Sequence, residues 1–175
     1  MILIVDMNCG KNSLAFDEFV MPIANVVKSN YEIEHYSEIK SAERYSKIIL
    51  SGTALKDNDF AKHVKKFSWI KKCGKPIFGI CAGMEIIALT FGSKLAKTKE
   101  IGMTKISTIK QNALLEGEFE AYELHNYAVI PSKEFEILAK SESCIQAIKY
   151  GEIYGVMFHP EVRNKSIIEK FIQQK

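Results

Sequence analysis

Residues 75–85 read KPIFGICAGME, and this stretch decides the fold class. The apolar run 76–80 is typical of a buried strand. It leads directly into G-I-C-A-G at 79–83, and a helix is expected from there to about residue 91. Glycines two residues on either side of Cys81 suit a tight turn, in which any Cβ would strike neighbouring backbone. The pattern predicts a strand, a sharp turn that carries Cys81, and a helix that begins immediately after it.

The chain before this stretch predicts alternating strands and helices. Continuous or alternating apolar runs indicate strands at 1–5, 31–36 and 47–50. Apolar residues three and four apart indicate a helix over 14–28, which Pro22 should shorten or kink. A second helix is expected over about 59–72.

The chain after Gly92 has a different pattern, in which short strands follow one another without long helices between them. These strands are expected at 103–110, 119–129, 135–140, 145–149 and 154–158. A final helix is expected at about 165–173, with Asn164 as its N-cap. The order of elements predicts an α/β fold with an open, mostly parallel, doubly wound sheet of the flavodoxin-like kind, extended by antiparallel strands in the second half.

Length and composition place limits on what the chain can be. With 175 residues, 47% of them hydrophobic and 26% charged, it fits one globular domain over 1–175. The net charge is only +3, and the 24 basic residues are spread along the chain, so neither nucleic acid nor a membrane is an expected partner. No apolar run approaches the roughly 20 residues that cross a bilayer.

The N-terminus and the cysteines bear on the location of the protein. The start, MILIVD, has no basic region and reads as a strand rather than a signal peptide. Four cysteines show neither a CxxC spacing nor a disulfide framework, so reduced thiols in the cytoplasm are expected. They are Cys9, Cys73, Cys81 and Cys144.

Cys81 and His159 together indicate nucleophilic chemistry. A cysteine at a helix N-terminus lies in the positive end of the helix dipole, which favours the thiolate, and the N–H of Ala82 would face a developing oxyanion. A buried structural cysteine would show the same short motif. Residues 155–162, GVMFHPEV, supply the second element: His159 at the end of a buried strand can act as base, and Glu161 can orient it. His35 and His63 are expected at the surface.

At these residues the sequence resembles the class I glutamine amidotransferases over nearly its whole length. GICAGME is similar to the family's G-x-C-x-G-x-Q turn, and FHPEV is similar to its base motif. The segment 50–52 resembles the start of the oxyanion loop, 99–102 an E-x-G segment, and 125–127 a loop on the substrate side. Chain length and FHPEV are most similar to the free-standing glutaminase subunit of archaeal-type GMP synthase.

The resemblance implies glutamine hydrolysis through a thioester on the cysteine, with ammonia passed to a separate synthetase subunit. Neither a metal nor an organic cofactor is expected. The implied roles are catalysis for Cys81, His159 and Glu161, an oxyanion hole for Thr53 and Ala82, and substrate binding for Gly52, Glu85, His125, Asn126 and Tyr127.

Three positions depart from the family pattern. Glu85 stands where the family usually has Gln, Thr53 replaces the second glycine of S-G-G-P, and Met157 replaces a Gln common in GMP-synthase-type subunits. Two alternatives therefore stay open. One is a stand-alone hydrolase of another γ-glutamyl or amide substrate, in which Glu85 binds a substrate amine. The other is a degenerate, non-catalytic regulatory subunit.

Overall fold

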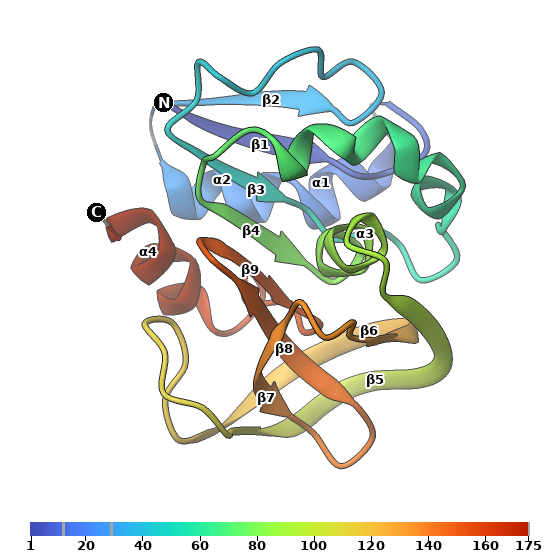
Figure 1. Cartoon of the computed structure of the whole chain (residues 1–175), viewed down its shortest axis with the longest axis vertical. Coiled ribbons are helices and arrows are strands. Elements are labelled where there is room, and N and C mark those ends of the chain that lie inside the picture. Colours follow the sequence, from blue (N-terminus) through green and yellow to red (C-terminus); the bar gives the residue numbers. More distant parts are fainter. Residues whose placement is uncertain (12, 29, 175) are drawn as a thin grey trace.

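The computed structural model describes residues 1–11, 13–28 and 30–174. Within them, nine strands form one sheet in the order β2-β1-β3-β4-β9-β8-β7-β5-β6 (Figure 1). The strands are β1 Ile2–Asp6, β2 Tyr31–His35, β3 Lys47–Leu50, β4 Ile77–Ile80, β5 Lys94–Thr108, β6 Glu118–Ile130, β7 Glu136–Lys140, β8 Ile145–Tyr150 and β9 Ile153–Val156. The helices are α1 Leu14–Phe19, α2 Met21–Val27, the 3₁₀ helix η1 Asp59–Lys71, α3 Ala82–Thr90 and α4 Lys165–Gln173.

The first half of the sheet is parallel and covered by helices on both faces. Strands β2, β1, β3, β4 and β9 pair in parallel. Side chains alternate along β1: Ile2 and Ile4 join the core beneath α2 and α4, whereas Leu3 and Val5 join the core beneath η1 and α3. The prediction of a doubly wound, mostly parallel sheet is therefore confirmed.

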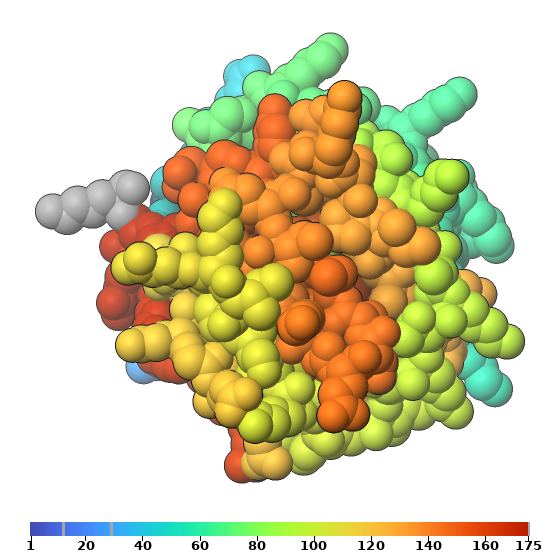
Figure 2. Space-filling view, turned by 60° about the horizontal axis from the view of Figure 1, so that its bottom comes forward, coloured from blue at the N-terminus to red at the C-terminus, as the bar shows by residue number. Residues whose placement is uncertain are grey.

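The second half of the sheet is antiparallel, as predicted, and it curls. Strands β9, β8, β7, β5 and β6 pair antiparallel in that order. In the strand order, β6 lies at the edge of the sheet, four strands away from β9. The N–H of His159, just after β9, nevertheless donates to the carbonyl oxygen of Tyr122 on β6 at 2.9 Å. Figure 1 shows the β5–β6 hairpin passing beneath the parallel half, and Figure 2 shows the outer face that β5 and the β7–β8 hairpin form. The curl brings β6 to the carboxyl ends of β4 and β9.

Two predicted helices differ from the structure in detail. The helix expected over 14–28 is divided into α1 and α2 at Val20, and Pro22 occupies the first turn of α2, where its missing N–H costs nothing. The second helix is a 3₁₀ helix with a non-helical residue at His63 (φ −114°, ψ 26°). Asn164 is the N-cap residue of α4, although its side chain makes no capping hydrogen bond.

The prediction that His35 lies at the surface was wrong. His35 ends β2 beside the end of β1 and is only 9% exposed. Its Nε2 lies 2.7 Å from the carbonyl oxygen of Asn8, and its Nδ1 lies 2.7 Å from Ser37 Oγ. The polar residues around His35 in the sequence gave no sign that the loop after β1 would cover it. His63 is partly exposed, with its ring 3.3 Å from Asp59.

None of the helices in the described ranges has the length and apolar character needed to span a bilayer. One continuous sheet supports the prediction of a single domain over 1–175, which stays a prediction.

Candidate active site

Cys81 occupies a strained turn between β4 and α3. Its backbone has φ +48° and ψ −104°, a region that residues with a side chain rarely adopt. Such a conformation costs about 1–3 kcal/mol and persists only where neighbouring structure enforces it. Here the Cys81 N–H donates to Val156 O at 2.8 Å, and the Cys81 carbonyl accepts from the N–H of Glu85 at 2.9 Å. The sharp turn predicted from G-x-C-x-G is present, and it places the sulfur at the start of α3.

The two glycines of the motif are required by close backbone contacts. A Cβ on Gly79 would lie 2.5 Å from the carbonyl carbon of Gly83. A Cβ on Gly83 would lie 2.5 Å from the carbonyl oxygen of Leu50 on β3. Both separations are shorter than real Cβ contacts, so α3 can start this close to the sheet only with glycine at both positions.

His159 and Glu161 form a buried pair directly after β9. Nδ1 of His159 lies 2.7 Å from Oε1 of Glu161, and the two side chains are 1% and 0% exposed. Since an ionised carboxylate only accepts hydrogen bonds, Nδ1 carries the hydrogen. Nε2 is then the basic atom, and it is buried without a hydrogen-bond partner among the described residues. This is the tautomer that a general base next to a nucleophile requires.

Cys81 and His159 are close enough for each to change the other's pKa. Burial raises the pKa of the Cys81 thiol, and His159 opposes this effect. Burial lowers the pKa of His159, but Glu161 and Cys81 outweigh burial and hold that pKa well above its usual value. Sγ of Cys81 lies 3.7 Å from the carbonyl oxygen of Leu124 on β6. The thiol therefore has a resting acceptor on β6 and a base beside it.

A small pocket beside Cys81 collects most of the residues expected at the site. Five of them line it: Thr53, Ala82, Glu85, His125 and Asn126. Its volume is about 10 Å³, the space of about one water molecule. A glutamine-sized molecule cannot enter until part of this wall moves.

The loop after β3 forms one wall of the pocket. The N–H groups of Thr53 and Ala82 make no hydrogen bond within the described part of the chain, so both are free to bind an oxyanion. Thr53 does not adopt a positive φ, so replacing the family's glycine causes no backbone strain here. Its Oγ1 donates to Asp57 O at 2.9 Å. Asn126 Nδ2 donates to Leu55 O at 2.9 Å and ties this loop to β6.

Gly52 and Tyr127 are not among the described residues that line the pocket. Gly52 lies behind it, where a Cβ would be 2.5 Å from Cε1 of His159. Its missing side chain therefore makes room for the imidazole. Tyr127 is half-buried and pairs with Lys97 in the β5–β6 hairpin. A substrate-binding role for these two residues stays a prediction.

Glu85 and His125 both line the pocket. Glu85 is 4% exposed, and burial raises its pKa to about 7, against a weaker opposing effect of His125. Close to neutral pH the carboxyl group is therefore partly protonated, and in that form it offers one donor and one acceptor, like the amide of Gln. Both ring nitrogens of His125 face other groups, because Nδ1 lies 3.1 Å from Thr98 O and Nε2 lies near Glu100 and Glu123.

Sequence reasoning missed several residues at the site. Leu124 and Leu55 take part through backbone carbonyls, which leave no mark in a side-chain pattern. Phe19 flanks the His159 ring with 5.5 Å between centroids, and in the sequence it looks like an ordinary core position of a helix. The polar cluster behind His125 was also missed, because its members are scattered from Glu100 to Gln146.

Comparisons with known proteins identify the family of the chain. The family glutamine amidotransferase class-I matches residues 21–175. The chain is 40% identical over 134 residues to a subunit of GMP synthase (glutamine-hydrolyzing) from Methanocaldococcus jannaschii, a match that covers 71% of this chain and 69% of the relative. It is 28% identical over 167 residues to anthranilate synthase component 2 of Archaeoglobus fulgidus, covering 92% and 88%.

Solved structures show the same fold. A putative GMP synthase subunit from Thermoplasma acidophilum superposes with a TM-score of 0.80 at 26% identity, covering 98% of this chain and 91% of the other. A glutamine amidotransferase from Thermotoga maritima gives a TM-score of 0.74 at 18% identity, covering 98% and 80%. With the family matched from residue 21 to the last residue, this chain belongs to the class I glutamine amidotransferases.

Proposed function

We propose that the chain hydrolyses glutamine through a γ-glutamyl thioester on Cys81 and supplies the ammonia to a separate synthetase subunit of the GMP synthase type. The observation that carries the proposal is the strained Cys81 at the start of α3, next to a histidine whose Nδ1 is held by a buried carboxylate. A nucleophile, a base and an orienting acceptor are the three groups that a thiol-dependent amidohydrolase needs.

In the first half-reaction, the sulfur of Cys81 attacks the side-chain carbonyl of glutamine while His159 Nε2 takes the thiol proton. The carbonyl oxygen becomes an oxyanion, which the N–H groups of Thr53 and Ala82 stabilise. His159 then returns the proton to the nitrogen, the C–N bond breaks, and ammonia leaves. The acyl group stays on sulfur as a thioester.

In the second half-reaction, His159 Nε2 takes a proton from water, whose oxygen attacks the thioester. The C–S bond breaks, glutamate is released, and the proton returns to sulfur. Glu161 stays ionised throughout and stabilises the imidazolium that forms in each half. Glu85, in its protonated form, is the acceptor and donor proposed for the substrate's polar groups.

The synthetase partner is proposed from the names of the relatives. Membership of the family indicates amidotransferase chemistry, but it does not identify the molecule that accepts the ammonia. Several relatives are named as one of the subunits of GMP synthase (glutamine-hydrolyzing). A cytoplasmic location is proposed with it, because the four cysteines of the chain are free and thiols stay reduced in that compartment. No cofactor enters either half-reaction.

Covalent labelling tests this function. The purified chain is treated with a glutamine analogue that carries a diazo-ketone, with and without the candidate synthetase, and its intact mass is measured. One adduct per chain is expected on Cys81. The adduct should be absent in Cys81→Ala and present in Cys73→Ala, a cysteine far from the pocket. If Cys81 stays unlabelled with the synthetase present, the chain is a non-catalytic subunit.

One observation favours a second candidate, a stand-alone hydrolase of γ-glutamyl amides. A buried acidic side chain occupies the position of the family's Gln, and in its ionised form it would bind an amine on the substrate. A panel of γ-glutamyl amides, assayed without any partner, separates the two. Faster turnover of an amine-bearing amide than of glutamine, lost in Glu85→Gln, would replace the glutaminase proposal.

A further inference from the structure

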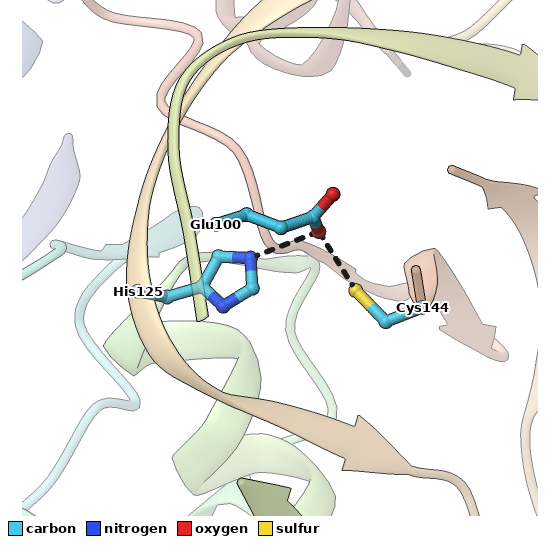
Figure 3. A group of neighbouring side chains, drawn as sticks. All are labelled: Glu100, His125 and Cys144. Carbon is cyan, nitrogen blue, oxygen red and sulfur yellow. Dashed lines mark hydrogen bonds and ion pairs between the residues drawn. The ribbon is translucent and has the colours of Figure 1, made fainter. Parts of the chain in front are cut away.

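Next to the catalytic pocket, around His125, lies a cluster of potential metal ligands, of which only Cys144 is partly exposed. Glu100 comes from β5 just after a shift in the β5–β6 register, Glu123 and His125 come from β6, and Cys144 comes from the turn between β7 and β8. Figure 3 shows Glu100, His125 and Cys144 pointing toward one another from these three segments. The side chains of Glu100, His125 and Glu123 are 9%, 1% and 0% exposed.

The donor atoms of the cluster are close together. Oε2 of Glu100 lies 3.3 Å from His125 Nε2 and 3.2 Å from Cys144 Sγ. One donor atom from each of the three residues falls within 4.8 Å of the others. Oε2 of Glu123 lies 3.2 Å from His125 Nε2. Three to four donors of nitrogen, oxygen and sulfur type thus face one small space.

The tautomer of His125 directs a lone pair into this space. Nδ1 lies 3.1 Å from the carbonyl oxygen of Thr98, which only accepts, so Nδ1 carries the hydrogen. The lone pair of the neutral ring is then on Nε2 and faces two carboxylates. His125 Nε2 and both carboxylate oxygens of Glu123 are buried without a hydrogen-bond partner in the described residues. Buried, unpaired acceptors of this kind are costly unless a cation lies among them.

A proton can take the place of that cation on Nε2. Burial lowers the pKa of His125, but Glu123 and Glu100 outweigh burial and raise that pKa. A protonated ring would compensate part of the negative charge, and the thiol of Cys144 donates to Glu100 Oε2 at 3.2 Å. The single Nε2–H would nevertheless face both Glu100 and Glu123 and could serve only one of these carboxylates. A divalent ion satisfies the nitrogen, the carboxylates and the sulfur together.

We propose that Glu100, His125 and Cys144 bind a divalent transition-metal ion of the zinc class, with Glu123 as a further ligand. Zinc binds Cys sulfur at about 2.3 Å and His nitrogen or carboxylate oxygen at about 2.0–2.2 Å, so neighbouring ligands of a tetrahedral site lie about 3.2–3.7 Å apart. The 3.3 Å between His125 Nε2 and Glu100 Oε2 matches the spacing of a nitrogen and an oxygen ligand. The 3.2 Å between Cys144 Sγ and Glu100 Oε2 is about 0.3 Å shorter than a sulfur–oxygen pair on zinc, so the sulfur would move outward when the ion binds. A thiolate and an imidazole select zinc over magnesium or calcium.

Surrounding groups fit the role of outer-shell partners. A ligating histidine usually donates its other N–H to a carbonyl or carboxylate, as His125 does to Thr98. The amide of Gln146 donates to Glu100 Oε2 at 2.9 Å, which fixes the orientation of that carboxylate. When the metal binds, Cys144 loses its proton to solvent and binds as thiolate.

The site would join three segments that are far apart in the sequence. The ion ties β5, β6 and the β7–β8 turn together at the residue next to Leu124, whose carbonyl accepts from Cys81. It would therefore hold the β6 wall of the catalytic pocket in place without taking part in the chemistry. The family resemblance gave no reason to expect a metal.

Metal titration tests the proposal independently of glutamine hydrolysis. Protein made without a polyhistidine tag is stripped with a chelator, and Co²⁺ is added as a spectroscopic probe, followed by Zn²⁺. One Co²⁺ per chain is expected, with a thiolate-to-cobalt charge-transfer band that Zn²⁺ abolishes. The melting temperature should rise with added Zn²⁺.

Variants identify the ligands. Cys144→Ala should lose the band and bind Co²⁺ at least ten-fold more weakly, whereas Cys81→Ala and Cys73→Ala should keep both. If Cys144→Ala does not fold, Glu100→Gln serves instead, because it keeps the shape of the side chain and should weaken binding by the same factor. A protein that binds no Co²⁺ stoichiometrically, or a band that disappears in Cys81→Ala and survives in Cys144→Ala, overturns the proposal.

Discussion

The imidazole of His159 donates a 2.7 Å hydrogen bond from Nδ1 to Oε1 of Glu161, two residues further along the chain. Both side chains lie in the interior, so no water competes for this bond. The bond fixes the tautomer and the ring plane of His159, and the negative charge raises the pKa of the ring. Loss of the carboxylate should therefore affect both the rate and its pH dependence.

Glu161→Gln is expected to lower kcat for glutamine by about 10²–10⁴-fold, because the amide no longer stabilises the imidazolium and can favour the wrong tautomer. At low pH His159 already carries a proton and cannot act as base, so the activity falls. Since Glu161 raises the pKa of His159, its removal should move this acid limb to lower pH. Initial rates measured between about pH 5 and 9 give both the change in kcat and the shift of the acid limb, because this interval brackets the usual pKa values of histidine. An unchanged acid limb would contradict the role given to Glu161.

Gly52→Ala should lower kcat by at least about 10²-fold, since a displacement of about 1 Å in a catalytic group has that effect. The new Cβ would lie 2.5 Å from Cε1 of His159, so the ring must move. Gly10→Ala is the matched control, because its nearest contact would be an ordinary 3.8 Å from Ser13. Kinetics and circular dichroism are measured on both. Equal activity in the two variants would show that His159 is not held by this contact.

Glu85→Gln should stabilise the protein above neutral pH. The pKa of Glu85 rises from 4.5 to about 7 on folding, so the unfolded chain loses this proton first. Stability is therefore lost as the pH rises from about 4.5 to 7, by up to about 3 kcal/mol. The variant removes this loss. Urea unfolding at about pH 5 and pH 8, on either side of this range, should show a larger gain at the higher pH. An equal gain at both would contradict the raised pKa.

The same substitution should change how glutamine hydrolysis depends on pH. The wild-type kcat/KM is expected to fall as the pH rises through about 7, because ionised Glu85 can no longer donate to the substrate. Glu85→Gln keeps a donor at every pH, so this limb should disappear from its profile. A wild-type profile that stays flat across neutral pH would show that Glu85 does not bind the substrate.

Asn126→Ala should open the pocket more often. The lost hydrogen bond to Leu55 contributes about 1 kcal/mol, which corresponds to about a five-fold increase in the open population. Alkylation of Cys81 by a small haloacetamide, followed by peptide mapping, should become faster by about that factor. Asn112→Ala, which removes hydrogen bonds in a distant turn, should leave the rate unchanged. No change in Asn126→Ala would mean that another contact closes the pocket.

The cysteine and histidine of the site were predictable because short-range patterns encode them. A buried strand followed by G-x-C-x-G predicts the turn at Cys81 from neighbouring residues alone, although in the folded chain Leu50 and Val156 help to hold it. The apolar patterns that predicted the strands of the parallel half likewise involve only residues that are neighbours in the sequence. By contrast, His35 looked exposed because its neighbours in the sequence are polar, and the loop after β1 covers it.

The sequence alone determined the α/β order of elements, the turn that carries Cys81, and the His159–Glu161 pair. Only the tertiary structure decided that β6 returns to the carboxyl ends of β4 and β9. This path of β6 closes the pocket with Leu124 and Asn126. It also brings Glu100, His125 and Cys144 together. The physical reason is that the order of strands and helices follows from residue patterns that span only a few positions. The curl of the sheet depends on pairings between strands that are far apart in the chain, and those pairings are fixed only when the whole core packs.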